Sequence, residues 1–167
     1  MTNKLNNIVL NCYDEKDDNH NRLLLEFLGN SSSNYIHDID RRLKNNKIKN
    51  DCIFDRGYIV SFNDILIGYV FISKLIKDDL YLEYSILKDY RGKGFGKLLL
   101  NEVSIYLIDN YNIKSIVLDI DPSNTPSIMT AVSCGYIADE EEYIERNMNG
   151  KILYRIDNYN YVNKRKK

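Results

Sequence analysis

Apolar and polar positions recur along the first third of the chain in patterns that predict a strand and two helices. The largely apolar run over residues 7–13 predicts a short strand. Asp17 or Asp18 is then placed to cap a helix with apolar positions on one face. A serine-rich run ends this helix, a second helix is expected over residues 35–43, and residues 44–51 read as a polar loop.

The middle of the chain reads as a hairpin followed by a third strand. Residues 58–62 and 65–75 are apolar and β-branched, and the pair Asn63-Asp64 between them predicts a tight turn. A further turn at residues 78–79 leads into a strand over residues 80–87, in which apolar side chains occupy every second position.

The last part of the chain alternates helices and strands. A stripe with a period of 3.6 residues predicts a helix over residues 97–110, and the apolar run 115–120 is typical of a strand buried on both faces. Pro126 suits the first turn of a helix that ends before Gly135. Closing strands are expected at residues 136–138 and 152–156, around a turn at Asn149-Gly150.

These elements predict one mixed α/β domain over residues 1–167, with a disordered basic tail at residues 163–167. With 44% apolar residues the chain can bury a core, and its 23 basic and 24 acidic residues show no excess that would favour a nucleic-acid partner. The chain has neither an apolar run of about 20 residues nor the basic-then-apolar start of a signal peptide. We therefore expect neither membrane nor nucleic-acid binding.

The cysteines and histidines offer no recognisable metal site. Cys12, Cys52 and Cys134 are an odd number of widely spaced thiols, which is typical of a reducing compartment. Only His20 and His37 are available, and no Cys/His pair has the spacing of metal ligands. The expected location is the cytoplasm, without a metal ion.

The most informative segment lies between the third strand and the 97–110 helix. A helix start has unpaired N–H groups and a partial positive charge, and glycines let the backbone approach a diphosphate closely. Basic side chains add to the attraction for an anion. The Walker pattern does not fit, because it needs Ser or Thr where the chain has Leu98. The dinucleotide fingerprint does not fit either, because it needs glycine where the chain has Lys97. The segment consists of Arg91, Gly92, Lys93, Gly94, Phe95, Gly96 and Lys97.

The pattern [Q/R]-x-x-G-x-[G/A] does fit, at Arg91, Gly94 and Gly96. With the approach 86–90, and with Asn124 followed eleven residues later by Gly-Tyr, the chain resembles the GNAT superfamily of acyl-CoA-dependent N-acetyltransferases. The likeness is specific over about residues 57–138.

The resemblance implies a GNAT fold, a splayed and mostly antiparallel mixed sheet of six or seven strands with about four helices. It implies that acetyl-CoA binds with its diphosphate on residues 91–97 and its pantetheine arm paired with backbone near Tyr84 and Ile86. That arm would enter a V-shaped opening between the strands 80–87 and 115–120. Asn124 would also contact the coenzyme. A helix N-cap is the other reading of this position, and one side chain can serve both roles.

The amine acceptor has to lose a proton, since an amine with a pKa of about 10.4 is neutral in only roughly one molecule in 2,500 at pH 7. Glu83, Asp119 and Asp121 are the candidate bases, with Glu83 and Asp119 preferred; each also reads as a solvated strand end. Ala131 stands where the family often has a tyrosine that protonates the departing sulfur. Cys134 reads as a small buried hydrophobe, because no histidine is near it in the sequence.

The expected function is transfer of an acetyl group to a primary amine of a small molecule or peptide. A catalytically silent acyl-CoA-binding or interaction module is the alternative, and a nucleotide-binding regulator lacks its signature. The acidic run 139–142 attracts a cationic acceptor or is plain solvated surface. The acceptor's identity and the oligomeric state stay open, a homodimer being one option.

Overall fold

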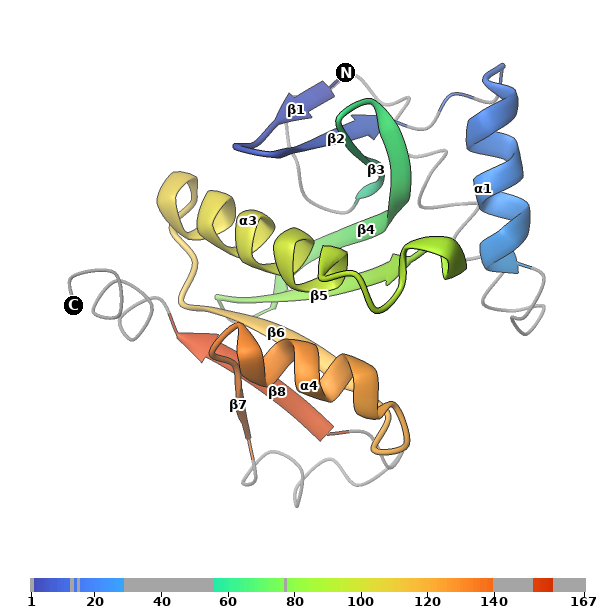
Figure 1. Cartoon of the computed structure of the whole chain (residues 1–167). Coiled ribbons are helices and arrows are strands. Elements are labelled where there is room, and N and C mark those ends of the chain that lie inside the picture. The colour runs from blue at the N-terminus through green and yellow to red at the C-terminus, as the bar shows by residue number, and fades with distance from the viewer. Residues whose placement is uncertain are drawn as a thin grey trace. The chain divides into compact units, whose positions relative to one another are not determined.

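The structure is a computed structural model that describes residues 2–12, 14, 16–28, 56–76, 78–139 and 152–157. Figure 1 shows the strands and helices of these residues along the chain. In chain order they are β1 (Thr2–Lys4), β2 (Ile8–Cys12), α1 (Asp18–Leu28), β3 (Arg56–Phe62), β4 (Ile65–Ile76), β5 (Asp79–Ile86), the 3-10 helix η2 (Lys88–Tyr90), α3 (Phe95–Asn110), β6 (Ser115–Ile120), α4 (Thr125–Ser133), β7 (Ile137–Ala138) and β8 (Ile152–Asp157).

The strands form one mixed sheet in the order β1-β2-β3-β4-β5-β6-β8-β7. Strands β5 and β6 run parallel, whereas β1–β2, β2–β3, β3–β4, β6–β8 and β7–β8 run antiparallel. The predicted α/β class with a mostly antiparallel mixed sheet is confirmed. The described sheet has eight strands, because the three-residue β1, which no sequence pattern indicated, pairs with β2.

The local predictions meet the structure closely. Strand β6 has the predicted bounds, and Asn63 and Asp64 have positive φ angles of 49° and 63°, the conformation of a two-residue hairpin turn. Helix α3 begins at Phe95, two residues earlier than predicted. The second helix predicted over residues 35–43, the loop at 44–51, the turn at Asn149-Gly150 and the basic tail all lie outside the described residues.

Two compact units make up the chain, one of Met1–Ser73 with Tyr84–Gly96 and the other of Lys74–Glu83 with Lys97–Lys167. In the first unit, the buried face of α1 packs on β3 and β4 through a cluster of apolar side chains, and two partly buried leucines extend it. The cluster consists of Leu23, Leu24, Ile59, Tyr69 and Phe71, with Leu66 and Leu87 at its edge. Burial of these side chains holds α1 on the sheet.

In the second unit, Arg155 on β8 ties several strands together. Its Nη1 lies 2.7 Å from Asp79 Oδ1 at the start of β5 and donates to Ser115 Oγ of β6 at 2.7 Å. Its Nε donates to Asp139 Oδ2, just after β7, at 3.1 Å. The guanidinium thereby satisfies groups on neighbouring strands at one end of the unit.

Polar contacts also join α3 to the segment that follows α4 in the second unit. Ser104 Oγ on α3 lies 2.7 Å from the hydroxyl of Tyr136, and both residues are buried. The thiol of Cys134, at the end of α4, points to the carbonyl of Lys97 at 3.7 Å. Burial raises the pKa of the Cys134 thiol, so it stays protonated and behaves as the predicted small hydrophobe.

Candidate functional site

The predicted anion site is an exposed turn that leads from η2 into α3 in the first unit. Gly92 and Gly94 have φ angles of +72° and +84°, a region that side chains with a Cβ rarely adopt. No heavy atom lies within 4 Å of where a Cβ would stand on either glycine. The two glycines are therefore required by the backbone conformation, and they leave the turn open to a ligand.

Arg91 holds this turn against the end of β5. Its backbone N–H donates to the carbonyl of Lys88 at 3.2 Å, and its side-chain Nε donates to the carbonyl of Ile86 at 2.8 Å. The prediction gave Arg91 only a charge near the anion. In the structure, part of its guanidinium serves to fix the turn, which a sequence motif does not reveal.

Aromatic rings anchor the turn from the other side. The ring of Phe95 meets those of Phe62 and Tyr90 edge-on, with centroids 5.3 Å and 5.8 Å away. The Nζ of Lys93 lies 5.7 Å from the centre of the Tyr90 ring, within cation–π range. Phe62 and Tyr90 were not among the predicted site residues, although the aromatic residue directly before Arg91 was visible in the sequence.

The first turn of α3 completes the positive environment. The first N–H groups of a helix have no partner within the helix and carry its positive dipole end. No acidic side chain occupies this first turn, and Lys97 is exposed. Backbone and side chains together favour a polyanion here.

The end of β5 lies close to β4, and this sets the direction of its backbone groups. The N–H of Leu87 donates to the carbonyl of Ile67 at 3.0 Å, and a Cβ on Gly68 would stand 2.3 Å from the carbonyl of Ser85. Since successive residues of a strand point their backbone groups to opposite sides, those of Tyr84 and Ile86 point away from β4. The pairing of β5 with β6 covers only residues 79–81 of β5.

The three predicted carboxylates differ in their surroundings. Glu83 is half-buried on β5, and Asp119 is the exposed position of the otherwise buried β6. The Oδ1 of Asp121 accepts hydrogen bonds from the N–H and the hydroxyl of Ser123 at 2.8 Å and 2.6 Å. Asp121 thus shapes the loop before α4.

Asn124 and Ala131 both lie on or next to α4. Asn124 is its N-cap, since Oδ1 accepts the N–H of Ser127 at 3.2 Å, as one of the two readings predicted. Among the described residues, its side-chain NH₂ makes no hydrogen bond. Ala131 is fully buried, so a tyrosine would not fit there without displacing the core. Tyr136 does not replace it, because its hydroxyl is engaged with Ser104.

The part of the chain that the structure describes shows neither a cluster of metal ligands nor a membrane-spanning helix. Among those residues, His, Cys, Asp and Glu side chains form no group of three that could hold a metal ion. None of the described helices combines the length and the apolar character needed to cross a bilayer.

Similar folds occur among solved structures. A ribosomal L7/L12 alpha-N-protein acetyltransferase in complex with coenzyme A gives a TM-score of 0.72 at 15% identity, over 94% of this chain and 98% of that one. An acetyltransferase from Agrobacterium tumefaciens gives 0.69 at 13% identity, over 93% and 94%. A spermidine/spermine N-acetyltransferase from Vibrio cholerae gives 0.68 at 20% identity, over 95% and 98%.

Sequence comparison identifies the family. No curated protein matches the chain by sequence. The sequence model of the Acetyltransferase (GNAT) family, whose members use acetyl-CoA, matches residues 20–136, which is most of the chain and includes the turn and its flanking strands. The chain therefore belongs to the acetyltransferase (GNAT) family and is an acyltransferase.

Proposed function

We propose that this acyltransferase moves an acetyl group from acetyl-CoA to a primary amine, and that the turn at residues 91–97 holds the coenzyme's diphosphate. The observation that carries the proposal is the open turn with Gly92 and Gly94 at positive φ directly before a helix. An unliganded surface turn needs neither two such glycines nor cations on both sides of them.

The residues present fit the charge and shape of a diphosphate. Lys93, between Gly92 and Gly94, and Lys97, after them, are both exposed, and the backbone of Phe95 and Gly96 belongs to the first turn of α3. The open space over Gly92 and Gly94 lets phosphate oxygens reach backbone N–H groups. Asn124 would add a side-chain donor to the coenzyme.

The backbone of β5 offers a place for the pantetheine arm. Groups of Tyr84 and Ile86 point away from β4, and β6 pairs with β5 only before this point. The Ile86 carbonyl already accepts a bond from Arg91, so we propose that its N–H and the backbone of Tyr84 take the arm. Both residues are thereby binding residues through main-chain atoms.

The chemistry requires a neutral amine. Bound acetyl-CoA supplies a thioester whose carbonyl carbon accepts the amine and whose thiolate leaves. We propose that Glu83 removes the proton from the attacking nitrogen, directly or through water, with Asp119 as the second candidate. A thiol with a pKa near 8.5 leaves tolerably as thiolate. This accommodates the buried Ala131, since general acid catalysis contributes about 10²- to 10⁴-fold and its loss slows turnover without abolishing it.

The acceptor class is supported by the fold relatives. Their names describe acetylation of the alpha nitrogen of a ribosomal protein and of spermidine or spermine. A panel of peptide, polyamine and small-molecule amines, assayed for release of free coenzyme A thiol, would identify the acceptor of this chain. Thiol release that depends on an amine also separates turnover from mere coenzyme binding.

Gly94→Asp tests the coenzyme site. We expect calorimetry to show acetyl-CoA affinity lowered at least a hundredfold, because the side chain is disfavoured at φ +84° and its carboxylate would repel the diphosphate. The domain should stay folded, since nothing lies within 4 Å of the new Cβ.

Gly135→Ala is the matched control. Gly135 follows α4 with φ +92° and carries the same backbone strain outside the turn. The affinity of the Gly135→Ala variant for acetyl-CoA should equal that of the wild type. Unchanged affinity in Gly94→Asp would refute the coenzyme site.

A further inference from the structure

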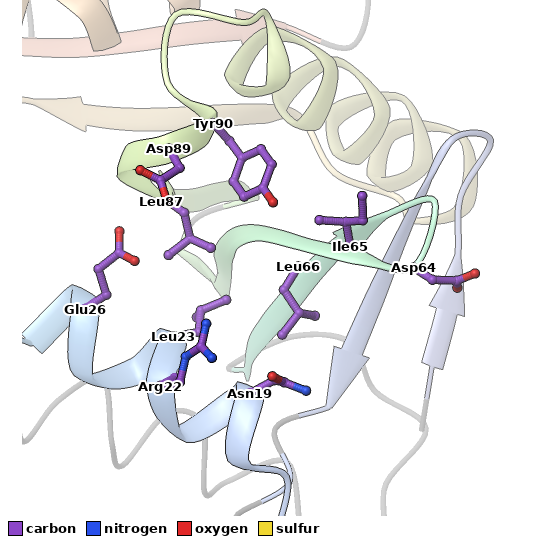
Figure 2. A pocket seen from close by; sticks show the side chains of 10 residues that line it. All are labelled: Asn19, Arg22, Leu23, Glu26, Asp64, Ile65, Leu66, Leu87, Asp89 and Tyr90. Atoms are coloured by element: carbon purple, nitrogen blue, oxygen red, sulfur yellow. The ribbon is translucent and has the colours of Figure 1, made fainter.

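A pocket of about 350 Å³ opens in the first unit, on the side of the sheet covered by α1. Figure 2 shows that its walls come from α1, from the start of β4 with the turn before it, and from residues 87–90. None of the residues proposed to bind the coenzyme or to remove the proton lines it.

The floor of the pocket is apolar and belongs to the core. Leu23 is buried in the apolar cluster that holds α1 on the sheet, and Leu66 and Leu87 pack against that cluster. Leu87 is also fixed by its backbone bond to Ile67. These three leucines therefore offer a rigid apolar surface at the bottom of an open hollow.

The rim is acidic and its orientation is partly fixed. Glu26 and Asp89 lie on one side of the hollow and Asp64 on the other, with Arg22 as the guanidinium of the lining (Figure 2). The Oε1 of Glu26 accepts the backbone N–H of Lys88, which sets this carboxylate beside Asp89. Among the described residues, Glu26, Asp64 and Asp89 form no ion pair.

A tyrosine closes the remaining side. In Figure 2 the ring of Tyr90 stands over the hollow, with its hydroxyl directed toward Ile65 and Leu66. Three carboxylates against the single guanidinium of Arg22 make the lining net negative, which favours a cation over an anion. The acidic rim alone would be ordinary solvated surface; the apolar floor beneath it adds a place for the body of a ligand.

We propose that this pocket binds a small organic ammonium ion. Its alkyl body lies on Leu23, Leu66 and Leu87, and its charged nitrogen lies between Glu26 and Asp89. The proposal is independent of the acetyl-transfer function, and binding can be measured without turnover.

The test uses a cation that cannot be acetylated to an amide. N,N-dimethylhexylamine is protonated at pH 7 and, as a tertiary amine, cannot serve as the acceptor. Calorimetry on the full chain would compare it with 1-hexanol and hexanoate, which have the same alkyl length. We expect the amine to bind at least fivefold more tightly than hexanol, and hexanoate to bind most weakly. Equal affinity of amine and alcohol would overturn the proposal.

Two variants locate the site. The double variant Glu26→Gln with Asp89→Asn should weaken the amine about tenfold and leave hexanol unchanged, because each exposed charge pair changes affinity up to about fivefold. Ile65→Trp places a large side chain at the rim, where Ile65 is 52% exposed, and should abolish binding of both probes without disturbing the core.

Asp109→Asn is the control for the loss of a carboxylate. Asp109 is exposed on α3 and does not line the pocket. Its affinity for the amine should match the wild type. Tight amine binding that survives in both pocket variants, with circular dichroism showing them folded, would also overturn the proposal.

Discussion

Arg91 and Asn124 each make a local bond besides standing at the candidate coenzyme site. Arg91 holds the carbonyl of Ile86, and Asn124 caps α4 through Ser127. A side chain that is held in this way presents its remaining donors in a fixed direction, so less freedom is lost when a ligand binds. The motif residues thus help to shape the candidate site.

Glu83→Gln tests the proposed base. We expect kcat to fall more at pH 7 than at pH 9, because at higher pH a larger share of the amine is already neutral. The loss at pH 7 should be about 10²-fold or more. The measurement is the pH profile of thiol release with a fixed acceptor.

Asp119→Asn separates the two candidate carboxylates. If Glu83 is the base, Asp119→Asn should leave the pH profile in place and change kcat little. Equal losses at both pH values in Glu83→Gln, together with a pH-dependent loss in Asp119→Asn, would transfer the role to Asp119.

At the scale of elements, the close approach of β4 and β5 depends on Gly68. A Cβ there would stand 2.3 Å from the carbonyl of Ser85 and 3.2 Å from the Cα of Ile86. Both atoms belong to the backbone, so a rotamer change cannot relieve the clash. The missing side chain therefore sets where the end of β5, and with it the proposed pantetheine partner, lies relative to β4.

Gly68→Ala should consequently raise KM for acetyl-CoA several-fold and lower the free energy of unfolding by about 1–3 kcal/mol. Ile59→Val is a suitable control, because it weakens the same unit by about 0.5–1.5 kcal/mol without touching β5. Steady-state kinetics and urea unfolding measure both effects. A KM shift of the same size in the two variants would contradict the positioning role of Gly68.

At the scale of the whole molecule, stability against acid should depend on the group around Arg155. Burial raises the pKa of Asp79, but the hydrogen bonds from Arg155 and Ser115 and the charge of Arg155 outweigh it, so the pKa lies below its usual value. Burial likewise opposes the charged form of Arg155. The hydrogen bonds and charges of Asp79 and Asp139 favour that form more strongly, so the pKa of Arg155 is raised.

The direction of the shift at Asp79 fixes the pH range. A lowered pKa means that the stabilisation is complete above about pH 5, one unit above the unfolded-state value of 3.8, and is lost as the pH falls through the folded-state pKa. Asp79→Asn should lower the free energy of unfolding by about 1–3 kcal/mol at pH 7 and flatten its decline between pH 4 and pH 2. Urea unfolding across this range would show it, and parallel curves for variant and wild type would count against it.

Much of the fold could be predicted because its signals are local. The tight turn at residues 63–64 and the buried run of β6 depend on neighbouring residues alone. Strand β1 was missed because three residues carry no periodicity, and it forms only by pairing with β2. The place of β8 between β6 and β7 depends on pairing of distant residues, which no local pattern encodes.

The site divides in the same way. The glycine turn was predicted because positive φ angles and a following helix leave a direct trace in residue types. The motif could not reveal the bond from Arg91 to Ile86, the aromatic contacts of Phe95 or the need for glycine at position 68. Each of these involves atoms that only folding brings together.

The ring of Tyr90 meets that of Phe95 in the turn proposed to hold the coenzyme, and Tyr90 also lines the acidic pocket. The chain contains no tryptophan. Tyr90→Trp would introduce the only tryptophan of the chain, and its fluorescence would respond to a ligand bound at the turn and to one bound in the pocket. Titrating acetyl-CoA in the presence of the amine, and the amine in the presence of acetyl-CoA, would then show through the fluorescence whether one ligand changes the affinity for the other. Any such change has to be equal in both directions.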